Sequence, residues 1–280
     1  ARSLVLQVTN GCSWNRCTFC EMYTAPQKRF NLKHPDEIAG DLAEVAAAGY
    51  PVRRVFLADG DAMTLSMRRL RNILIDIRRY LPDVQRVSSY CLPRNLRHKS
   101  ADELAELREL GLTLYYVGCE SGDDLVLDRV SKGETFETSL SALEKIRTAG
   151  ARSSVMILNG MGGKRHSEQH AVNSARLMNA AQPDYLATLV LSFPAGMRRY
   201  QDGFNGEFEP LDQPGLFSEM RLLLETLELE RTVFRSDHAS NYLVLKGTLN
   251  RDKAKLLATL DAALDAPGSV PLRQEWQRGL

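Results

Sequence analysis

The sequence has 280 residues, of which 44% are hydrophobic and 25% charged, and its formal net charge is +1. This composition is typical of a globular protein, no apolar run reaches the roughly 18 residues that a membrane span requires, and the near-neutral charge provides no general attraction to nucleic acid or anionic membranes. An odd number of cysteines, five in all with three of them clustered, favours a reducing compartment, so we expect a cytoplasmic protein.

Strands and helices are predicted to alternate along most of the chain. Short β-branched and leucine-rich runs predict strands, and amphipathic runs with capping residues and terminal glycines predict helices. The expected strands cover residues 4–8, 52–57, 84–90, 112–117, 153–158 and 185–191, and the expected helices cover residues 35–48, 66–81, 100–111, 123–130, 136–149 and 167–181. Six successive strand–helix units favour parallel strands joined by right-handed crossovers.

The pattern changes after the sixth strand. Residues 192–213 are rich in glycine, proline and aromatic residues, which predicts a long loop that is either functional or disordered. A helix over 214–229, an apolar stub over 232–234 and a polar cluster, Arg235–Tyr242, should follow. A short strand and a last helix over 251–264, capped by Asn250, complete the expected elements, and the tail after residue 267 is expected to be loose.

Three cysteines stand directly after the first expected strand. Cys12, Cys17 and Cys20 form a C-x4-C-x2-C pattern within nine residues. Clustered cysteines in such a chain are first of all metal ligands. A structural zinc site closes with four protein ligands, whereas three cysteines on an iron–sulfur cluster leave one iron open for a small molecule. Zinc, completed by His34 or a distant cysteine, is the alternative.

A first strand followed by three clustered cysteines, with the aromatic Phe19 before the last one, resembles the radical S-adenosylmethionine (SAM) superfamily. The spacing usual there is C-x3-C-x2-C, one residue shorter than here. The resemblance implies an open partial (βα)6 TIM-like barrel and a [4Fe–4S] cluster whose free iron chelates SAM. It further implies that one-electron reduction, by an external donor such as a flavodoxin or ferredoxin, cleaves SAM to a 5′-deoxyadenosyl radical that abstracts a hydrogen atom from the substrate.

The same resemblance assigns cofactor-binding roles to residues at the ends of the strands. Asp59-Gly60-Asp61 occupies the place of a Gly-Gly-Glu-type motif that receives the SAM ammonium, with aspartate in place of the first glycine. Glu120 would contact the ribose, and Lys132, twelve positions later, would pair with the SAM carboxylate, as in anaerobic coproporphyrinogen oxidases and methylthiotransferases. Tyr90 aligns with a further SAM-contacting position, and Asn159-Gly160 resembles a glycine motif near the adenine. Simple turns, a capping acid and a solvated lysine are the structural alternatives.

Other polar residues carry weaker expectations. Cys91 and Cys119 stand near strand ends, where one of them could be a hydrogen-atom donor or an auxiliary cluster ligand, although an isolated cysteine there is usually a small buried residue. His166 and His170 are expected to be solvated. The Arg235–Tyr242 cluster either shapes the substrate pocket, with Asp237 and His238 orienting the substrate, or holds the open barrel shut.

Taken together, these patterns predict a minimal radical SAM enzyme in a single compact domain. Residues 1–192 would form the core barrel, and residues 193–280 would cap or close it. The expected substrate is a small molecule, by elimination, since no further cofactor or RNA-binding module is evident. The alternatives are a radical SAM enzyme that modifies RNA or peptide, and a non-catalytic iron–sulfur or zinc module.

Overall fold

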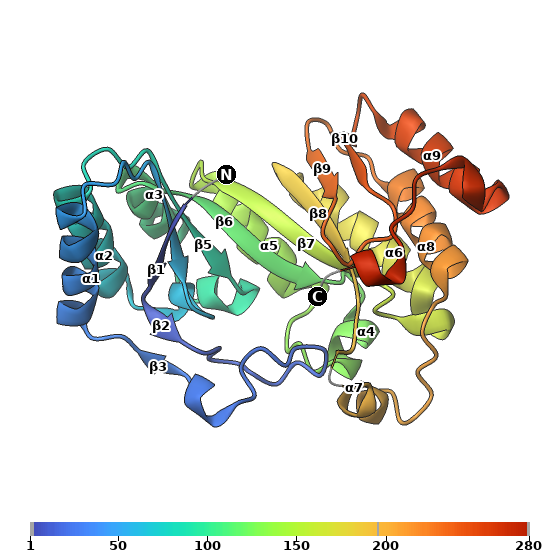
Figure 1. Cartoon of the computed structure of the whole chain (residues 1–280), viewed down its shortest axis with the longest axis horizontal. Coiled ribbons are helices and arrows are strands. Elements are labelled where there is room, and N and C mark those ends of the chain that lie inside the picture. Colours follow the sequence, from blue (N-terminus) through green and yellow to red (C-terminus); the bar gives the residue numbers. More distant parts are fainter. Residues whose placement is uncertain (1–2, 195, 279–280) are drawn as a thin grey trace. The chain divides into compact units, whose positions relative to one another are not determined.

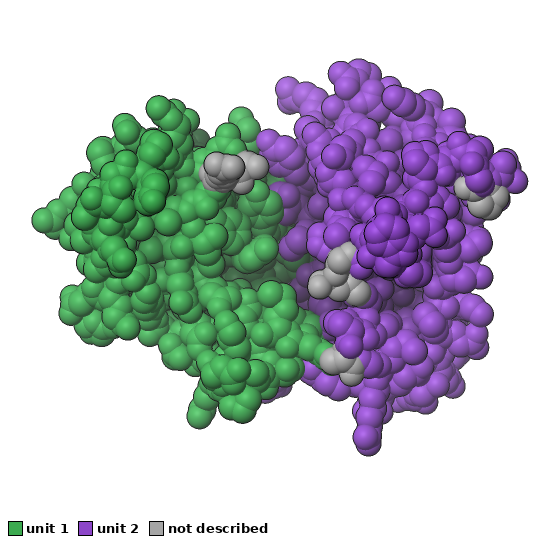
Figure 2. Space-filling view, in the orientation of Figure 1, with its two compact units in different colours: residues 1–15, 20–118, 141–153 green, residues 16–19, 119–140, 154–280 purple. Residues whose placement is uncertain are grey.

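The computed structural model describes residues 3–194 and 196–278, and its contacts divide into two compact units (Figure 2). The first unit comprises residues 1–15, 20–118 and 141–153, and the second comprises residues 16–19, 119–140 and 154–280. The boundary therefore passes through the cysteine loop, which contributes Cys12 and Cys20 to the first unit and Cys17 to the second.

The first unit begins with a strand and adds strand–helix repeats. Its elements are β1 (Leu4–Gln7), β2 (Thr9–Asn10), β3 (Asn31–Leu32), α1 (Pro35–Ala47), β4 (Arg54–Ala58), α2 (Met67–Tyr80), β5 (Arg86–Cys91), α3 (Ala101–Glu109) and most of β6 (Leu112–Glu120). β1 pairs with β4, β4 with β5 and β5 with β6, all in parallel. α1 packs against β1, and α2 lies beside α1 in Figure 1.

Capping side chains explain where these helices begin. Ser100 accepts a hydrogen bond from the Glu103 amide, and the Glu103 carboxylate accepts one from the Ser100 amide, so the predicted capping box of α3 is confirmed. His34 caps α1 in the same way, through its Nδ1 atom. In this structure the imidazole of His34, the residue that could have completed a zinc site, therefore caps a helix.

The second unit continues the alternation and then departs from it. Its elements are the end of β6, α4 (Asp124–Arg129), the start of α5 (Phe136–Thr148), most of β7 (Arg152–Asn159), α6 (Gly163–Ala181), β8 (Tyr185–Val190), α7 (Arg198–Gly203), α8 (Gln213–Thr226), β9 (Val233–Ser236), β10 (Leu245–Thr248) and α9 (Lys253–Asp265). β7 pairs with β8 and β8 with β9 in parallel, whereas β10 runs antiparallel to β9. α8 and α9 lie side by side near β10 in Figure 1.

The strand order, β1-β4-β5-β6-β7-β8-β9-β10, confirms the predicted α/β fold with an open, mostly parallel sheet, as in a partial TIM-like barrel. The six expected strand–helix units are present. The apolar stub over 232–234 is more than a stub: as β9 it adds a parallel strand after the sixth, and β10 adds an antiparallel one.

The expectation of a long loop over residues 192–213 is wrong in part, because this segment contains α7. Residue 195 lies outside the described residues. Tyr200, Phe204 and Phe208 are buried with Val126, Val130 and Met161 in one hydrophobic cluster. The Tyr200 hydroxyl donates a hydrogen bond to the Met161 carbonyl oxygen at 2.6 Å. Aromatic burial of this extent stabilises an ordered segment, which composition alone does not reveal.

The tail after residue 267 is also ordered as far as residue 278, contrary to expectation. Leu272 forms a β-bridge with Leu243, and Arg273 donates from its backbone to the Tyr242 carbonyl oxygen. The last helix begins at Lys253, with Asp252 rather than Asn250 as its preceding residue. Over the part of the chain that the structure describes, no helix is long and apolar enough to cross a membrane.

Candidate functional site

The start of the cysteine loop is fixed to the segment that follows β4, within the first unit. The Thr9 hydroxyl donates to the Asp59 carbonyl oxygen, and the Asp59 amide donates to the Thr9 carbonyl oxygen at 3.3 Å. The Ser13 hydroxyl, next to Cys12, donates to the Asp61 carboxylate. The chain around the first cysteine is therefore held by the residues predicted to receive the SAM ammonium.

Two glycines make this close approach possible. A β-carbon on Gly60 would lie 2.0 Å from the Gly11 carbonyl oxygen, and one on Gly11 would lie 2.1 Å from the Lys28 carbonyl oxygen. Both glycines also have positive φ angles, 78° and 70°. Since no other residue fits at either position without moving backbone, the second residue of Asp59-Gly60-Asp61 is required by packing alone.

The two aspartates of this segment differ in their surroundings. Asp59 accepts from the Tyr23 hydroxyl at 2.9 Å and pairs with Lys28 at 3.1 Å, in a partly exposed position. Asp61 is only 1% exposed, and burial raises the pKa of its carboxyl group although the hydrogen bond from Ser13 works in the opposite direction. Its Oδ1 atom is buried without a close hydrogen-bond partner among the described residues, although the Asn95 side chain also works to lower the pKa of this carboxyl group. Such an oxygen can accept a donor from a ligand.

The middle of the cysteine loop is anchored separately, within the second unit. The Thr18 amide donates to the Val130 carbonyl oxygen at 3.0 Å, and Arg199 donates to the Cys17 carbonyl oxygen at 3.4 Å. Phe19 packs against the hydrophobic cluster that contains Val130, Tyr200 and Phe204. The aromatic residue before the last cysteine thus joins this part of the loop to a hydrophobic core.

Glu120 and Lys132 meet at the end of β6, in the second unit. Lys132 Nζ lies 3.1 Å from Glu120 Oε1, and the two side chains are only 3% and 11% exposed. Burial is the largest single influence and works to lower the pKa of Lys132, but the charge and hydrogen bond of Glu120 together with the nearby Cys17 and Cys119 raise the pKa overall, so the ammonium form is stabilised. The twelve-residue correspondence therefore reflects a contact, and a solvated lysine is excluded.

The end of β7 is supported by residues that sequence reasoning missed. Glu219 on α8 accepts hydrogen bonds from the Gly160 amide and the Ser167 hydroxyl, both at 2.6 Å. Asn159 donates to the Leu216 carbonyl oxygen at 3.3 Å. Glu219 is 3% exposed, and its position among the apolar residues of α8 is the sequence signal that could have revealed it.

His170 belongs to the same buried region, so the expectation that it is solvated is wrong. It is 1% exposed, and its Nδ1 atom lies 2.7 Å from the Ser121 hydroxyl. Its Nε2 atom lies 3.0 Å from the Leu158 carbonyl oxygen. His170 therefore bridges the segment after β6 to the end of β7, next to Asn159 and Gly160.

Tyr90 lies near the end of β5 in a group of three aromatic rings. Its ring centroid is 4.8 Å from that of Phe56 and 6.2 Å from that of Tyr116, with the rings nearly perpendicular to one another. It is 45% exposed, and the pKa of its hydroxyl is raised by partial burial and by Tyr116. A protonated phenol here can donate a hydrogen bond to a ligand.

Asp237 and His238 lie after β9, in contacts within the second unit. Asp237 pairs with Lys246 at 2.8 Å near the surface, and His238 Nδ1 lies 2.9 Å from the Ser240 hydroxyl. The tail holds this segment, because Arg273 donates to the carbonyl oxygens of Asp237, His238 and Asn241. Arg278 donates to the Ser240 carbonyl oxygen.

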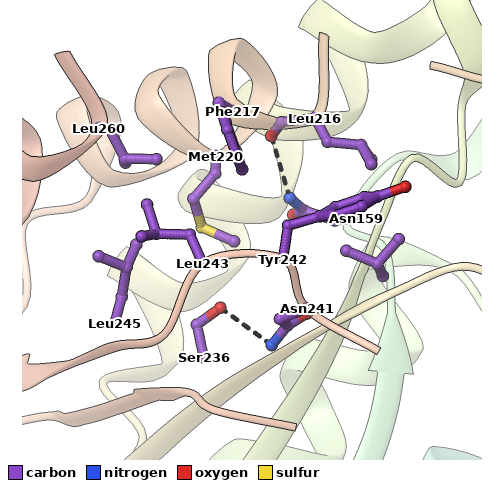
Figure 3. A pocket seen from close by; sticks show the side chains of 11 residues that line it. Asn159, Leu216, Phe217, Met220, Ser236, Asn241, Tyr242, Leu243, Leu245 and Leu260 are labelled. Atoms are coloured by element: carbon purple, nitrogen blue, oxygen red, sulfur yellow. Dashed lines mark hydrogen bonds between the residues drawn. The ribbon is translucent and has the colours of Figure 1, made fainter. Parts of the chain in front are cut away.

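A small cavity lies between this segment and α8 (Figure 3). Apolar side chains, among them Met220 and Leu260, line most of it, and Asn159 and Asn241 contribute amides. Asn241 donates to Ser236 Oγ, whereas its own Oδ1 atom is buried and accepts no hydrogen bond from described residues. The volume of about 20 Å³ accommodates roughly one water molecule, so this cavity is too small for a substrate.

All five cysteines are thiols outside disulfide bonds. Cys91 and Cys119 are buried, as expected, and burial raises the pKa of Cys119 to about 12. Cys12, Cys17 and Cys20 are partly exposed. Within residues 3–194 and 196–278, no three His, Cys, Asp or Glu side chains are grouped as a metal site. The assignment of the three cysteines as cluster ligands therefore stays a prediction from their pattern and donor chemistry.

Comparisons with known proteins agree with the predicted family. The family description "Radical SAM superfamily" matches residues 6–178. The heme chaperone HemW of Bacillus subtilis (strain 168) is 24% identical over 174 residues, which make up 59% of this chain and 45% of that protein. The chain thus spans less than half the length of this curated relative.

Solved structures share the fold. Coproporphyrinogen III oxidase (HemN) from Escherichia coli, a radical SAM enzyme, aligns with a TM-score of 0.59 at 15% identity, over 80% of this chain and 52% of that one. The methyltransferase TsrM from Kitasatospora setae, solved with cobalamin and a [4Fe–4S] cluster, aligns with a TM-score of 0.52 at 21% identity, over 67% of this chain and 36% of that one.

The family match includes all three clustered cysteines, Asp59-Gly60-Asp61, Glu120, Lys132 and Asn159-Gly160. It also covers more than half of the chain, and the predicted fold is present. The chain belongs to the radical SAM superfamily, enzymes whose cofactors are a [4Fe–4S] cluster and SAM.

Proposed function

We propose that this enzyme cleaves SAM reductively at a [4Fe–4S] cluster and uses the resulting radical to abstract a hydrogen atom from a small molecule. The observation that carries the proposal is the set of three partly exposed thiols outside disulfide bonds, Cys12, Cys17 and Cys20, within the range that matches the family. They supply the three thiolates that leave one iron of a cluster open. When bound, the cluster supplies the electron that cleaves SAM.

The chain's own residues would bind and orient SAM. The buried Asp61 carboxylate and the backbone around Gly60 would accept hydrogen bonds from the SAM ammonium, and Asp59 would support that turn through Tyr23 and Lys28. Gly60 lets this turn pack closely against the start of the cysteine loop, because a β-carbon there would lie 2.0 Å from the Gly11 carbonyl oxygen.

Glu120 and Lys132 would act as a pair. In this structure they neutralise each other, and SAM would bring a carboxylate for the ammonium of Lys132 and ribose hydroxyls for Glu120. Tyr90 would donate to the cofactor, and Asn159-Gly160, held by Leu216 and Glu219, would border the adenine. Asp237 and His238 would orient the substrate.

The proposal also includes partners. An external one-electron donor, such as a flavodoxin or ferredoxin, would reduce the cluster. Five cysteines outside disulfide bonds support a reducing compartment, so we propose a cytoplasmic location.

Anaerobic reconstitution with iron and sulfide tests the cofactor assignment. The wild-type protein should bind about four irons, turn brown and convert SAM to 5′-deoxyadenosine when a chemical reductant is added. Replacing Cys12, Cys17 and Cys20 together by alanine should abolish iron, colour and product. As a matched control, Cys91→Ala should retain the colour, because this buried thiol has no assigned role. A colourless wild-type protein with one zinc would contradict the proposal.

A further inference from the structure

One face of the sheet in the first unit carries an uncommon combination of side chains. Alternation along β4 gives Val55 and Leu57 one face, where both are fully buried, and Arg54 and Phe56 the other, where both are more exposed. The register extends that second face to the neighbouring strands. Val5 lies opposite Phe56, and Arg86 lies opposite Arg54.

The part of this face toward the C-terminal ends of β4 and β5 is aromatic. Phe56, Tyr90 and Tyr116 form a group in which every pair of ring centroids lies within 6.2 Å. None of the three is fully buried: Tyr90 is 45% exposed, and Val5 beside Phe56 is 67% exposed. Aromatic edges and faces that stay open to solvent can hold a further ring in the same edge-to-face manner.

The part of the face at the N-terminal ends of β4 and β5 is cationic. Arg54 and Arg86 are direct cross-strand neighbours, roughly 5 Å apart at the backbone. Within the described ranges neither forms an ion pair with a carboxylate, and Arg86 Nε is buried without a hydrogen-bond partner. Like charges directly opposite each other destabilise a sheet, whereas an anion between them would reverse that effect.

The aromatic and the cationic parts of the face are close enough for one small ligand to contact both. Arg54 and Phe56 are two residues apart on one strand, about 6.6 Å along the sheet. A ligand whose ring contacts Phe56 and Tyr116 could therefore place a carboxylate between the two guanidinium groups, if two or three bonds separate ring and carboxylate. An arginine fork matches a carboxylate in geometry as well as charge.

We propose that this face, at the residues Val5, Arg54, Phe56, Arg86 and Tyr116, is a substrate subsite and that it recognises a small aromatic carboxylic acid. The inference rests on the proposed function, because it names the substrate class of the same enzyme. It goes beyond it by assigning roles to Arg54, Phe56, Arg86 and Tyr116.

Binding of three matched probes tests the substrate class. Indole-3-propionate carries both features, indole-3-propionamide lacks the charge, and octanoate lacks the ring. Anaerobic calorimetry on the full chain with its cluster assembled should show that indole-3-propionate binds at least about tenfold more tightly than either of the others. Equal affinities, or an advantage for octanoate, would overturn the proposal.

Variants then separate charge from ring. Arg86→Gln should weaken indole-3-propionate binding by roughly 10- to 100-fold and leave the amide unchanged, while Arg86→Lys should restore part of the loss. Tyr116→Leu should weaken both aromatic probes. Arg53→Gln removes an equal charge from the residue that precedes β4, which strand alternation places on the other face. This variant should leave the affinity for all three probes unchanged. An equal loss in Arg53→Gln would refute a localised site.

A measurement on the wild-type protein avoids any folding defect of a variant. Phenylglyoxal modifies accessible arginines, and peptide mass analysis locates the modified positions. Indole-3-propionate should protect Arg54, whereas the amide should not, and Arg53 should react equally in all samples. Cleavage of SAM without any probe tests the proposed function separately. A protein that cleaves SAM but leaves Arg54 unprotected would overturn the substrate class alone.

Discussion

Polar residues follow strands at two kinds of position in the second unit. After β6 and β7 they are buried and paired, as in Glu120 with Lys132 and Glu219 with the Gly160 amide. After β9 they lie near the surface, where Asp237 pairs with Lys246 and both side chains are more than a third exposed. A charge that is buried needs its partner, whereas solvent replaces the partner of an exposed charge.

This contrast predicts where a substitution should lower the stability of the whole fold and where it should loosen only a local segment. At the buried ends, removing one group leaves another without a partner in a region of low dielectric. At the end of β9, the tail arginines and the lysine can be replaced by water. Four substitutions test this contrast, in order of decreasing expected effect.

Lys132→Met should have the largest effect, because it leaves the Glu120 carboxylate buried and unpaired. We expect a loss of roughly 3–5 kcal/mol in the free energy of unfolding, measured by urea denaturation of the cluster-free protein. The double variant Lys132→Met/Glu120→Gln should recover most of that loss, since no charge is then left alone. Equal stability of the single and double variants would show that the pair is not held as the structure indicates.

The sequence predicts the strands and helices well because they depend on local patterns. Alternating apolar residues, capping boxes such as Ser100 with Glu103, and terminal glycines act over a few residues. The twelve-residue relation of Glu120 and Lys132 is similarly local, since α4 alone separates them. The family resemblance singled out both residues as SAM ligands, but their contact with each other is seen only in the structure.

Contacts between segments that are distant in the sequence could not be predicted from the sequence. Glu219 meets Gly160 across 59 residues, and Arg273 reaches Asp237 across 36, and neither partner carries a local signal for the other. The segment over 192–213 was expected to be a loop because it is rich in glycine, proline and aromatic residues. The burial of those aromatic residues in one cluster, with Tyr200 completely buried, determines its structure. The composition of a segment shows how many turn-forming residues it has, but it does not show which hydrophobic core the segment packs against.

Glu219→Gln tests the second buried position. The amide has one acceptor oxygen where the carboxylate has two, so either the Gly160 amide or the Ser167 hydroxyl loses its acceptor. We expect a loss of about 1–3 kcal/mol in the free energy of unfolding. Glu225→Gln, on the exposed side of the same helix, is the control and should change stability by less than about 0.5 kcal/mol. A similar loss in both variants would remove the distinction between buried and exposed acids.

Arg273→Gln addresses the attachment of the tail. Its guanidinium donates to three carbonyl oxygens in the segment from Asp237 to Asn241, and water can replace it at each. We expect a loss of about 1–2 kcal/mol and faster amide hydrogen exchange confined to residues 237–242. Arg231→Gln, at an exposed position, should leave exchange unchanged. Faster exchange across the whole second unit would mean that the tail supports the core rather than one segment.

Asp237→Asn should have the smallest effect, and pH and salt reveal its origin. The hydrogen bond from Lys246, opposed by slight burial, holds the pKa of Asp237 below its usual value in the folded protein. A lowered folded-state pKa stabilises the fold above the unfolded-state pKa of about 3.9, and this contribution disappears as the pH falls through the folded-state value. Because the pair is exposed, the wild-type protein should exceed the variant by less than about 1 kcal/mol at pH 7. Urea denaturation should show this difference shrinking below about pH 4, and also at pH 7 in 1 M salt, where the Debye length falls to about 3 Å. If the difference in the free energy of unfolding were unchanged in 1 M salt, Asp237 would behave like the buried charges, which need their protein partner.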